Sequence, residues 1–292
     1  MTTKTRKKRT TEDLTSNPKE AALRDVLTSL GSVVVAYSGG VDSAYLALVS
    51  ARTLGARALA VTADSPSYPD RHRRLAIDIA RDFGLQHAII RTGELERADY
   101  RANPENRCYF CKTELYTHLA KIAAPRGATI VDGNNADDRS DYRPGRQAAR
   151  EFGVRSPLDD VDLTKDEIRE LSRAAGLPTW DEPASACLSS RIPYHHEVTD
   201  EKLRMIERAE RAIALLGFRV CRVRHFDDDR DAALARVEIG RDELGRALQP
   251  DTSSAIEREL KSIGYEEVTI DPQGYRRGSL NGLSEGRRLR VF

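Results

Sequence analysis

A short apolar strand that runs directly into a serine- and glycine-rich turn constrains this chain more than any other feature. Residues 33–37 read Val-Val-Val-Ala-Tyr, which is typical of a buried strand, and residues 38–43 read Ser-Gly-Gly-Val-Asp-Ser. Residues 44–54 then follow a helical pattern. Glycines allow the backbone to approach an anion closely, and the free amides at a helix start favour negative charge. The strand, turn and helix together predict a phosphate-binding loop.

We expect this loop to bind phosphate groups through Ser38, Gly39, Gly40 and Ser43. Asp42 would repel a phosphate unless Mg²⁺ stood between them, so its presence predicts a metal–phosphate complex. The loop is not a Walker A motif, because the Gly-x-x-x-x-Gly-Lys-Ser/Thr pattern is absent. An ordinary strand-to-helix turn is the alternative, which the complete hexapeptide after an apolar strand disfavours.

Strands and helices alternate from residue 32 to about residue 176, which predicts an α/β fold with a doubly wound parallel sheet. The predicted strands cover residues 33–37, 58–62, 87–90 and 129–131. A long polar loop is expected after the third strand, followed by a helix near residues 113–124, and Thr164-Lys165-Asp166-Glu167 form a capping box that predicts another helix start. Ligands of such sheets bind beyond the carboxyl ends of the strands. Asp64 follows the second strand, and Asp132-Gly133-Asn134-Asn135 follow the fourth. We therefore expect both segments to meet the phosphate loop at one edge, with Asp64 contacting the nucleotide.

The pattern changes past Thr199, where a long predicted helix precedes two strands, two helices and a last strand. This predicts a smaller α+β domain at residues 199–292, for substrate binding or oligomerisation, after a first domain at residues 18–198. Arg222 and Arg224 alternate along one predicted strand and so share a face that would suit an anionic substrate. A solvated edge with salt bridges is the alternative. The aspartate-rich stretch at 227–231 is interpreted as a surface loop.

Charge and composition argue against several classes of protein. The 47 Lys and Arg residues nearly balance 46 Asp and Glu residues, so the net charge of +1 gives no general attraction to nucleic acid. Residues 1–17 are locally basic and are predicted to be a disordered tail. No apolar run approaches the roughly 18 residues of a membrane span, and no export signal is recognisable. We therefore expect a cytoplasmic protein that binds neither nucleic acid nor membrane.

The four cysteines favour metal binding or catalysis over disulfide bonds, because no export signal accompanies them. Cys108 and Cys111 form a Cys-x-x-Cys pair, a spacing typical of metal and redox sites. Cys187 lies in a loop of small residues. A buried structural role is the alternative for Cys187, and it is the expected role of Cys221, which lies within a predicted strand.

The hexapeptide at 38–43 resembles the PP-loop of the ATP pyrophosphatase superfamily, whose fold is similar to that of the adenine nucleotide alpha hydrolases. The remaining motifs, together with this loop, resemble the LarE family over about residues 18–285. These motifs are Asn-Arg-Cys-Tyr-Phe-Cys-Lys at 106–112, Asp-Gly-Asn-Asn-Ala-Asp-Asp at 132–138, Asp-Tyr-Arg-Pro-Gly at 141–145, Pro-Ala-Ser-Ala-Cys-Leu-Ser-Ser-Arg at 183–191 and the stretch at 268–276. The cysteine-centred stretch at 183–191 is the most specific of them.

This resemblance implies an enzyme that splits ATP into AMP and pyrophosphate with Mg²⁺. Its implied substrate is pyridinium-3,5-biscarboxylic acid mononucleotide, whose carboxylates are adenylated and converted into thiocarboxylates. The product belongs to the biosynthesis of the nickel-pincer nucleotide of lactate racemase, so other proteins of that pathway are implied partners. Cys187 is the implied catalytic residue, and Arg191, four residues further on, would hold the anionic substrate. We also expect a homo-oligomer.

Two routes of sulfur delivery are compatible with the resemblance. In one, Cys187 gives up its own sulfur and becomes dehydroalanine. In the other, Cys108, Cys111 and Cys187 hold a [4Fe–4S] cluster whose fourth iron carries an exogenous sulfide. The Cys-x-x-Cys pair favours the cluster. A structural zinc site is the alternative for the pair, but it requires a fourth ligand that the sequence does not clearly supply.

Three other functions remain open. A tRNA thiolase of the same superfamily would also use several cysteines, but it would need a basic surface for RNA. An amidating ligase similar to NAD synthetase would use ammonia and leave the Cys187 loop without a role. A nucleotide-binding module without catalysis is the third alternative.

Overall fold

The computed structural model describes residues 17–140, 144–183, 186–228, 230, 232–276 and 278–280. The predicted tail lies outside these residues except for Asn17, which caps the first helix. Three residues of the motif at 141–145, two of the Cys187 loop and two of the stretch at 227–231 also lie outside them.

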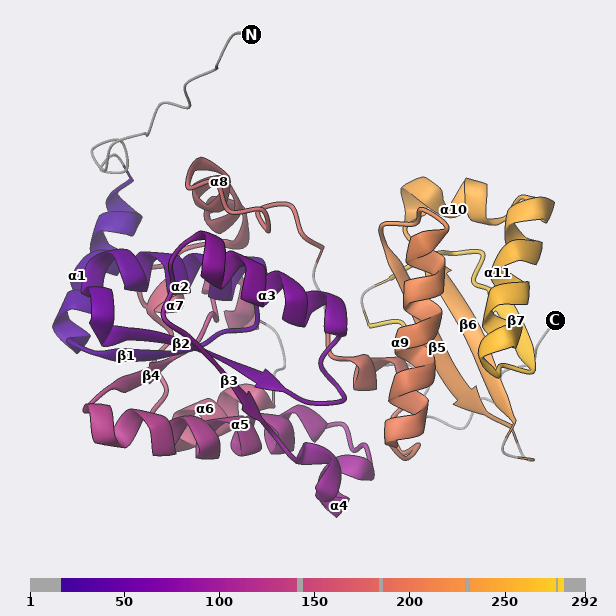
Figure 1. Ribbon diagram of the computed structural model, residues 1–292, viewed down its shortest axis with the longest axis horizontal. Coiled ribbons are helices and arrows are strands. Elements are labelled where there is room, and N and C mark those ends of the chain that lie inside the picture. The colour runs from indigo at the N-terminus through magenta and orange to yellow at the C-terminus, as the bar shows by residue number, and fades with distance from the viewer. Residues whose placement is uncertain are drawn as a thin grey trace, which may run out of the picture.

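The larger sheet has four parallel strands in the order β3-β2-β1-β4, which confirms the predicted parallel α/β fold (Figure 1). Its strands are β1 (Val33–Ala36), β2 (Ala58–Asp64), β3 (His87–Arg91) and β4 (Thr129–Val131). The chain runs from β1 outward to the edge strand β3 and then returns to place β4 on the other side of β1. A ligand site is expected where the strand order reverses in this way, at the carboxyl ends of β1 and β4.

Helices cover both faces of this sheet because β1 is apolar at every position. Val33 and Val35 face one core and Val34 faces the other. The first face is covered by α1 (Pro18–Leu30), α2 (Val41–Leu54), α3 (Asp70–Asp82), α7 (Pro157–Asp160) and α8 (Lys165–Ala174). The second face is covered by α5 (Arg107–Ala123) and α6 (Gly145–Glu151). Such a strand, buried on both sides, is what a parallel sheet requires.

The helix predicted at 113–124 begins earlier than expected, since α5 starts at Arg107. The stretch that contains Cys108 and Cys111 is therefore helical and does not belong to the predicted polar loop. Its apolar side chains, Phe110 among them, pack instead against a separate hydrophobic cluster and extend the helix. The two cysteines therefore lie three positions apart on one helix face. The short helices α4 (Ala98–Arg101), α6 and α7 were not predicted, because segments of this length carry little periodicity.

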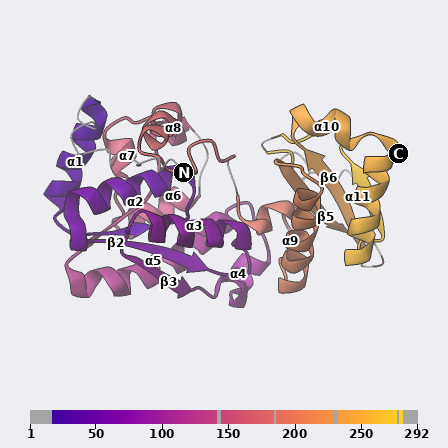
Figure 2. The ribbon, with the colours of Figure 1, turned by 45° about the horizontal axis from the view of Figure 1, so that its top comes forward.

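The second sheet has the order β5-β6-β7, with β5 and β6 antiparallel and β7 parallel to β6. Its strands are β5 (Cys221–Asp227), β6 (Ala233–Ile239) and β7 (Glu267–Ile270). Figure 2 shows α9 (Asp200–Leu215) and α11 (Pro250–Ile263) against one face of it, with α10 (Arg241–Ala247) at one end. Apolar residues of the strands point to these helices. The opposite face carries the alternating arginines of β5.

Helix α9 contributes to both halves of the molecule. Leu203 and Ile206, near its start, pack in a cluster with Tyr100 and Leu188. Ile213, near its end, packs against the small sheet. The domain division at residues 198 and 199 stays a prediction, because α9 belongs to both packing units.

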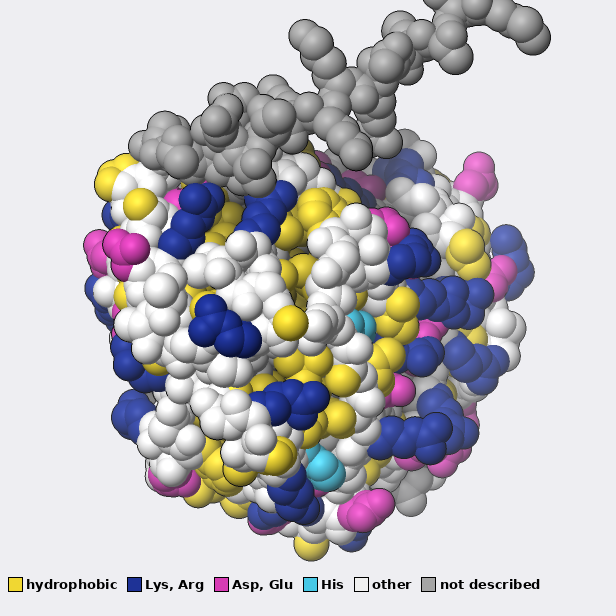
Figure 3. Space-filling view, turned by 60° about the vertical axis from the view of Figure 1, so that its left-hand side comes forward, with side chains coloured by type: hydrophobic (Ala, Val, Ile, Leu, Met, Phe, Trp, Pro, Cys, Tyr) yellow, Lys and Arg dark blue, Asp and Glu magenta, His cyan; other side chains and the backbone are white. Residues whose placement is uncertain are grey.

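In the part of the chain that the structure describes, no helix combines the length and the apolar composition that a bilayer span requires. On the face shown in Figure 3, basic and acidic side chains lie interspersed with uncharged ones. That mixture agrees with the near-zero net charge of the sequence.

A buried ion pair in the small sheet yields a stability prediction. Glu238 is fully buried and accepts hydrogen bonds from Arg224 Nε at 3.0 Å and Nη2 at 2.8 Å. Glu238→Gln leaves a buried guanidinium without its counter-charge, so unfolding free energy should fall by about 3 kcal/mol. Glu257→Gln, which breaks the exposed pair with Lys261, should cost below about 0.5 kcal/mol. Urea unfolding followed by circular dichroism measures both, and equal losses would contradict the prediction.

Candidate active site

The predicted phosphate loop joins β1 to α2 and has a backbone that only glycine adopts easily. Gly39 has a φ of +65°, and a Cβ atom there would lie 2.8 Å from the Cβ of Ala76 in α3. Gly40 is the N-cap of α2, so the amides that follow it start the helix without a side-chain cap. The loop can therefore present its backbone to an anion.

Hydroxyl groups fix the shape of the loop. Ser43 Oγ accepts from the backbone N–H of Ser38 at 3.1 Å, lies 3.1 Å from Ser38 Oγ, and donates to the Gly40 carbonyl at 3.2 Å. Tyr68 Oη donates to the Ser38 carbonyl at 2.8 Å. The two predicted serines thus contact each other, and the loop is held in shape by its own residues.

The loop after β4 meets the phosphate loop, as the sheet topology requires. A Cβ atom on Gly133 would lie 3.0 Å from the backbone N of Ser43, so only glycine permits this approach. Asp132, which is buried, accepts from Tyr116 Oη at 3.1 Å and from Ser156 Oγ at 2.7 Å. Asn135 Nδ2 donates to Asp42 Oδ1 at 3.3 Å. The predicted meeting of these two loops is confirmed.

Lys165 completes this edge and was missed in the sequence. Its Nζ lies 2.5 Å from Asp42 Oδ2, and its backbone N–H donates to Asp137 Oδ2 at 2.7 Å. The capping box of Thr164 and Glu167, which the sequence did predict, sets the start of α8 at this point. Only the packing of α8 beside α2 brings the lysine to the loop, and no local pattern reports that packing.

Asp64 lies at the end of β2, on the same edge of the sheet, as predicted. Its Oδ1 is 3.7 Å from Arg73 Nε, and its backbone carbonyl accepts from Thr92 N–H at 3.2 Å. Its contact with a nucleotide stays a prediction.

Three of the four cysteines gather on one side of α5. Cys108, which is exposed, and Cys111, which is half-buried, lie near the start of α5. Cys187 is half-buried and lies immediately before the 3₁₀ turn η6 (Leu188–Arg191). Burial, followed by the charge of Cys187, raises the pKa of the Cys108 thiol, and burial, followed by the charges of Glu94 and Cys187, raises the pKa of the Cys111 thiol. Cys111 also packs in the same cluster as Leu188, which follows Cys187. Cys221 is buried in β5, and burial raises the pKa of its thiol to about 12, as expected for a core residue.

Within the described ranges, no set of three or more His, Cys, Asp or Glu side chains is arranged as a metal site. The three thiols are therefore neighbours without forming a completed ligand set. The [4Fe–4S] and zinc expectations stay predictions.

Buried polar groups tie the Cys187 loop to α5. Arg107, which precedes Cys108, donates from Nη1 to the Ser189 carbonyl at 3.0 Å and also to Asn103 Oδ1. Tyr100 Oη lies 2.6 Å from Ser189 Oγ. Asn103 Nδ2 in turn donates to the carbonyl of Pro193 at 2.6 Å. These contacts hold the segment after Cys187 against the helix that carries the other two thiols.

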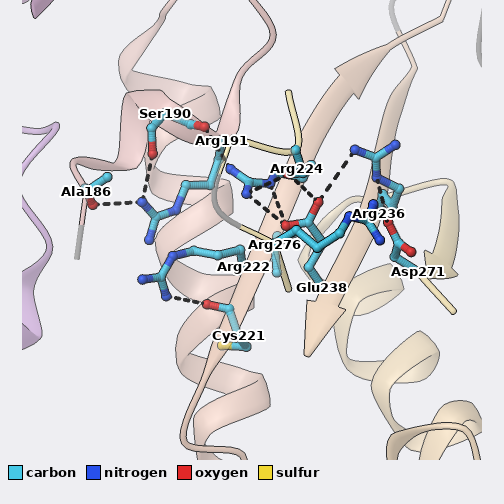
Figure 4. Close-up of polar contacts among 12 residues, drawn as sticks. Ala186, Ser190, Arg191, Cys221, Arg222, Arg224, Arg236, Glu238, Asp271 and Arg276 are labelled. Carbon is cyan, nitrogen blue, oxygen red and sulfur yellow. Dashed lines mark hydrogen bonds and ion pairs between the residues drawn. The ribbon is translucent and has the colours of Figure 1, made fainter. Parts of the chain in front are cut away.

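Arg191 binds the protein itself, which differs from the expectation of a substrate-binding group. It is 1% exposed, and its Nε and Nη2 donate to the two oxygens of Glu210 at 2.8 and 3.0 Å. Its Nη1 donates to the Ala186 carbonyl at 2.7 Å (Figure 4). The same nitrogen donates to the Cys187 carbonyl at 3.0 Å. With every nitrogen engaged, Arg191 holds the Cys187 loop onto α9. The sequence could not supply Glu210 as its partner.

Arginines crowd the outer face of the small sheet (Figure 4). Arg224 lies directly across from Arg236 in the ladder of β5 and β6, an arrangement that costs free energy without counter-charges. The counter-charges are Glu238, which binds Arg224, and Asp271, which pairs with Arg276 at 3.1 Å. Two buried donors, Arg236 Nε and Arg276 Nη1, have no hydrogen-bond partner among the residues that the structure describes.

The two arginines of the predicted pair, Arg222 and Arg224, have different partners. Arg224 is occupied by Glu238 and by the Ser190 carbonyl at 2.9 Å. Arg222 donates to the Cys221 carbonyl at 2.6 Å and stacks over Tyr275 at 5.2 Å. Arg224 is thus held in a buried salt bridge rather than at a solvated edge, and substrate binding by Arg222 and Arg224 stays a prediction.

A strand, a glycine turn that only glycine can form and a helix start flanked by Asp42 and Lys165 define a nucleotide-binding protein of the PP-loop class. Comparison with known proteins places the chain more narrowly. It is 33% identical over 276 residues to the pyridinium-3,5-bisthiocarboxylic acid mononucleotide synthase of Lactiplantibacillus plantarum. The aligned residues cover 94% of this chain and 98% of that protein. The chain belongs to the LarE family of PP-loop, ATP-using enzymes.

Other relatives agree with this assignment. An uncharacterized protein of Synechocystis sp. is 42% identical over 260 residues, covering 89% of this chain and 95% of that protein. A glutamine-hydrolyzing GMP synthase of Aeropyrum pernix is 27% identical over 217 residues, which are 68% of this chain and 42% of that protein. No protein-family profile matches the sequence.

His72 yields a pH prediction, because it is buried in α3 beside the arginines. Burial, followed by the positive charges of Arg71, Arg222 and Arg191, lowers the pKa of His72 to about 4. In the unfolded chain the pKa is about 6.5, so the unfolded state takes up the proton first as pH falls. The contribution of neutral His72 to the free energy of unfolding is therefore fully present above about pH 6.5. About 3 kcal/mol of that free energy should be lost by pH 4.

His72→Gln should flatten that dependence, as measured by chemical unfolding at several pH values. His118→Gln, which changes a partly exposed histidine in α5, is the matched control and should keep the wild-type slope. Identical slopes for the wild type and His72→Gln would contradict the interpretation.

Proposed function

We propose that this chain is an ATP-dependent sulfur transferase that acts on pyridinium-3,5-biscarboxylic acid mononucleotide. It would adenylate the carboxylates and convert them into thiocarboxylates, as part of the biosynthesis of the nickel-pincer nucleotide of lactate racemase. The relative from L. plantarum carries this activity in its name. The observation that carries the proposal is that one helix, α5, connects the phosphate edge to the thiols.

Helix α5 spans that distance with four side chains. Its first turn carries Cys108 and Cys111, and its Tyr116 donates to Asp132 at the phosphate edge. Between them, Lys112 is in electrostatic range of the thiols and Asp132, and its ammonium lies 5.5 Å from the Tyr116 ring centroid. An acyl group activated at the phosphate edge would therefore be formed beside the sulfur source.

The first step of the proposed reaction belongs to the phosphate edge. A carboxylate oxygen of the substrate attacks the α-phosphorus of ATP, the bond to the bridging oxygen breaks, and pyrophosphate leaves. The loop amides after Gly40 and the ammonium of Lys165 would stabilise the departing pyrophosphate. Asp42 offers a carboxylate to Mg²⁺, a hard cation that prefers oxygen ligands, so the donor chemistry fits the metal.

The second step replaces oxygen by sulfur. A sulfur nucleophile attacks the acyl carbon of the adenylate, and the carbon–oxygen bond breaks to release AMP. Adenylation is needed because a free carboxylate is a poor acyl donor. The arginine face near Arg222, where Arg236 Nε and Arg276 Nη1 form no hydrogen bond to any described residue, would hold the phosphate and carboxylates of the substrate. Arg191 and Arg224 would act indirectly, by fixing the loop that carries Cys187.

For the sulfur source we propose the three-cysteine route. Cys108, Cys111 and Cys187 offer three thiols in one neighbourhood, which suits the donor set of a [4Fe–4S] cluster better than zinc, which needs a fourth ligand. When bound, such a cluster would supply an iron without a protein ligand for an external sulfide. The alternative in which Cys187 gives up its own sulfur uses the same loop without Cys108 and Cys111.

The remaining expectations follow from the family. We propose that the chain acts in the cytoplasm as a homo-oligomer, with the other proteins of nickel-pincer nucleotide biosynthesis as partners. The domain at residues 199–292 would bind the substrate or form subunit contacts. Nucleic acid and membrane are not proposed as partners.

Substrate-dependent exchange of labelled pyrophosphate into ATP tests the adenylation step. The wild type should catalyse exchange with the pyridinium biscarboxylate mononucleotide and not with tRNA or deamido-NAD. Ser43→Ala should lower exchange at least about a hundredfold, because the phosphate loop loses the hydroxyl that shapes it. Ser50→Ala, which removes from the same helix a buried hydroxyl that bonds no described residue, should retain exchange. Exchange with tRNA alone, or full exchange by Ser43→Ala, would contradict the proposal.

The cysteine pair separates the two sulfur routes. Cys187→Ala should stop thiolation under either route. In anaerobically prepared enzyme, Cys108→Ser should remove iron and activity together, and the wild type should turn over repeatedly when sulfide is supplied. Cys221→Ala, which changes the core cysteine, should retain its iron. Iron analysis, visible spectra and product assays measure these outcomes.

One result would reverse this preference. An iron-free wild-type enzyme that thiolates a single equivalent and becomes lighter by one H₂S at Cys187 would establish the sacrificial route instead. Cys108→Ser would then keep nearly all of that single round.

A further inference from the structure

Two groups that the adenylation step needs separately are bound to each other in this structure. Asp42, in the first turn of α2, pairs through Oδ2 with Lys165 Nζ at 2.5 Å. The two residues are 123 positions apart in the sequence. Their side chains are 23% and 30% exposed, so a ligand arriving from solvent can reach both.

A metal ion and a phosphate group place opposite demands on this pair. A divalent cation that binds Asp42 must displace the Lys165 ammonium, since two cations at one carboxylate repel each other. A phosphate that approaches Lys165 meets the negative charge of Asp42. Either ligand alone breaks the ion pair and gives a new partner to only one of the two side chains. The two ligands together replace both halves.

We propose that the Asp42–Lys165 ion pair is an exchange switch that makes Mg²⁺ and the pyrophosphate group of ATP bind cooperatively. Without ligands, the two side chains neutralise each other inside the phosphate loop. With both ligands present, Asp42 serves the metal and Lys165 serves the phosphate oxygens. The inference rests on the proposed function only in taking MgATP as a substrate.

The surroundings anchor the Asp42 carboxylate and the backbone N–H of Lys165, whereas the lysine side chain is partly exposed. Asn135 Nδ2 orients Asp42 from the β4 loop, and Gly133 packs directly on the backbone of Ser43. The N–H of Lys165 is held by Asp137 Oδ2. A lysine has four rotatable side-chain bonds, so its ammonium can change partner without moving these anchors.

Two probes applied to two variants test the switch. Binding of Mn²⁺ alone is measured by electron paramagnetic resonance, and binding of pyrophosphate in excess EDTA is measured by calorimetry. Lys165→Gln should bind Mn²⁺ about tenfold more tightly than the wild type, because the competing cation is gone, and should bind pyrophosphate more weakly. Asp42→Asn should do the reverse, binding Mn²⁺ more weakly and metal-free pyrophosphate about tenfold more tightly.

Controls distinguish this exchange from damage to the fold. Lys165→Arg keeps the cation and should leave Mn²⁺ affinity near that of the wild type. Lys202→Gln breaks a comparable ion pair with Asp227, at 2.6 Å in the other half of the molecule, and should change neither affinity. A purely structural role predicts that both variants weaken both probes, and that outcome would overturn the switch.

Unchanged Mn²⁺ affinity in Lys165→Gln would overturn it as well, provided that MgATP still binds the wild type. Failure of the wild type to bind MgATP would instead contradict the proposed ATP-dependent function. The two failures are therefore distinguishable.

Discussion

The contact between Gly133 and the backbone of Ser43 is the constraint on which the rest of the site depends. It joins the carboxyl ends of β1 and β4, the two strands between which the order of the sheet reverses. Because the loops touch backbone to backbone, Asn135 reaches Asp42, and Asp132 stays close enough to receive Tyr116 from α5. Any side chain at position 133 would push these loops apart and separate the phosphate edge from α5, the helix that carries Cys108 and Cys111.

A second set of buried contacts connects the two sheets through the Cys187 loop. Arg191 binds this loop to Glu210 of α9, and Arg224 binds it to the small sheet through the Ser190 carbonyl. Arg107 binds the other side of the loop to α5. Charged side chains that are this deeply buried are held by several hydrogen bonds each, which is the condition for tolerating them. Cys187, the proposed reactive cysteine, is thus placed by three arginines that donate hydrogen bonds to the protein itself.

The sequence predicted the features that depend on local pattern. The parallel sheet, the glycine loop and the convergence of the β1 and β4 tips follow from apolar strands, turn residues and the topology rule for such sheets. The capping box at Thr164 also has a local signature. The start of α5 was placed too late, because the apolar residues between the two cysteines pack against a cluster formed by distant segments.

The partners of charged residues were the part that could not be predicted. Nothing near Asp42 in the sequence indicates Lys165, and nothing near Arg191 indicates Glu210, because each pair is created by helix packing. The role expected of Arg191 changed for this reason, whereas Cys221 was correctly assigned to the core from its strand pattern alone. Residues that act through the backbone were thus easier to recognise than those that act through a distant counter-charge.

The central claim is that a carboxylate oxygen of the substrate is transferred to AMP and replaced by sulfur. Its most direct test is a turnover with substrate labelled by oxygen-18 in its carboxylates, followed by mass spectrometry of the nucleotide and phosphate products. The account predicts a single oxygen-18 atom in AMP for each thiocarboxylate formed, and none in pyrophosphate. Label in pyrophosphate or in inorganic phosphate, or thiocarboxylate formed alongside unlabelled AMP, would contradict it.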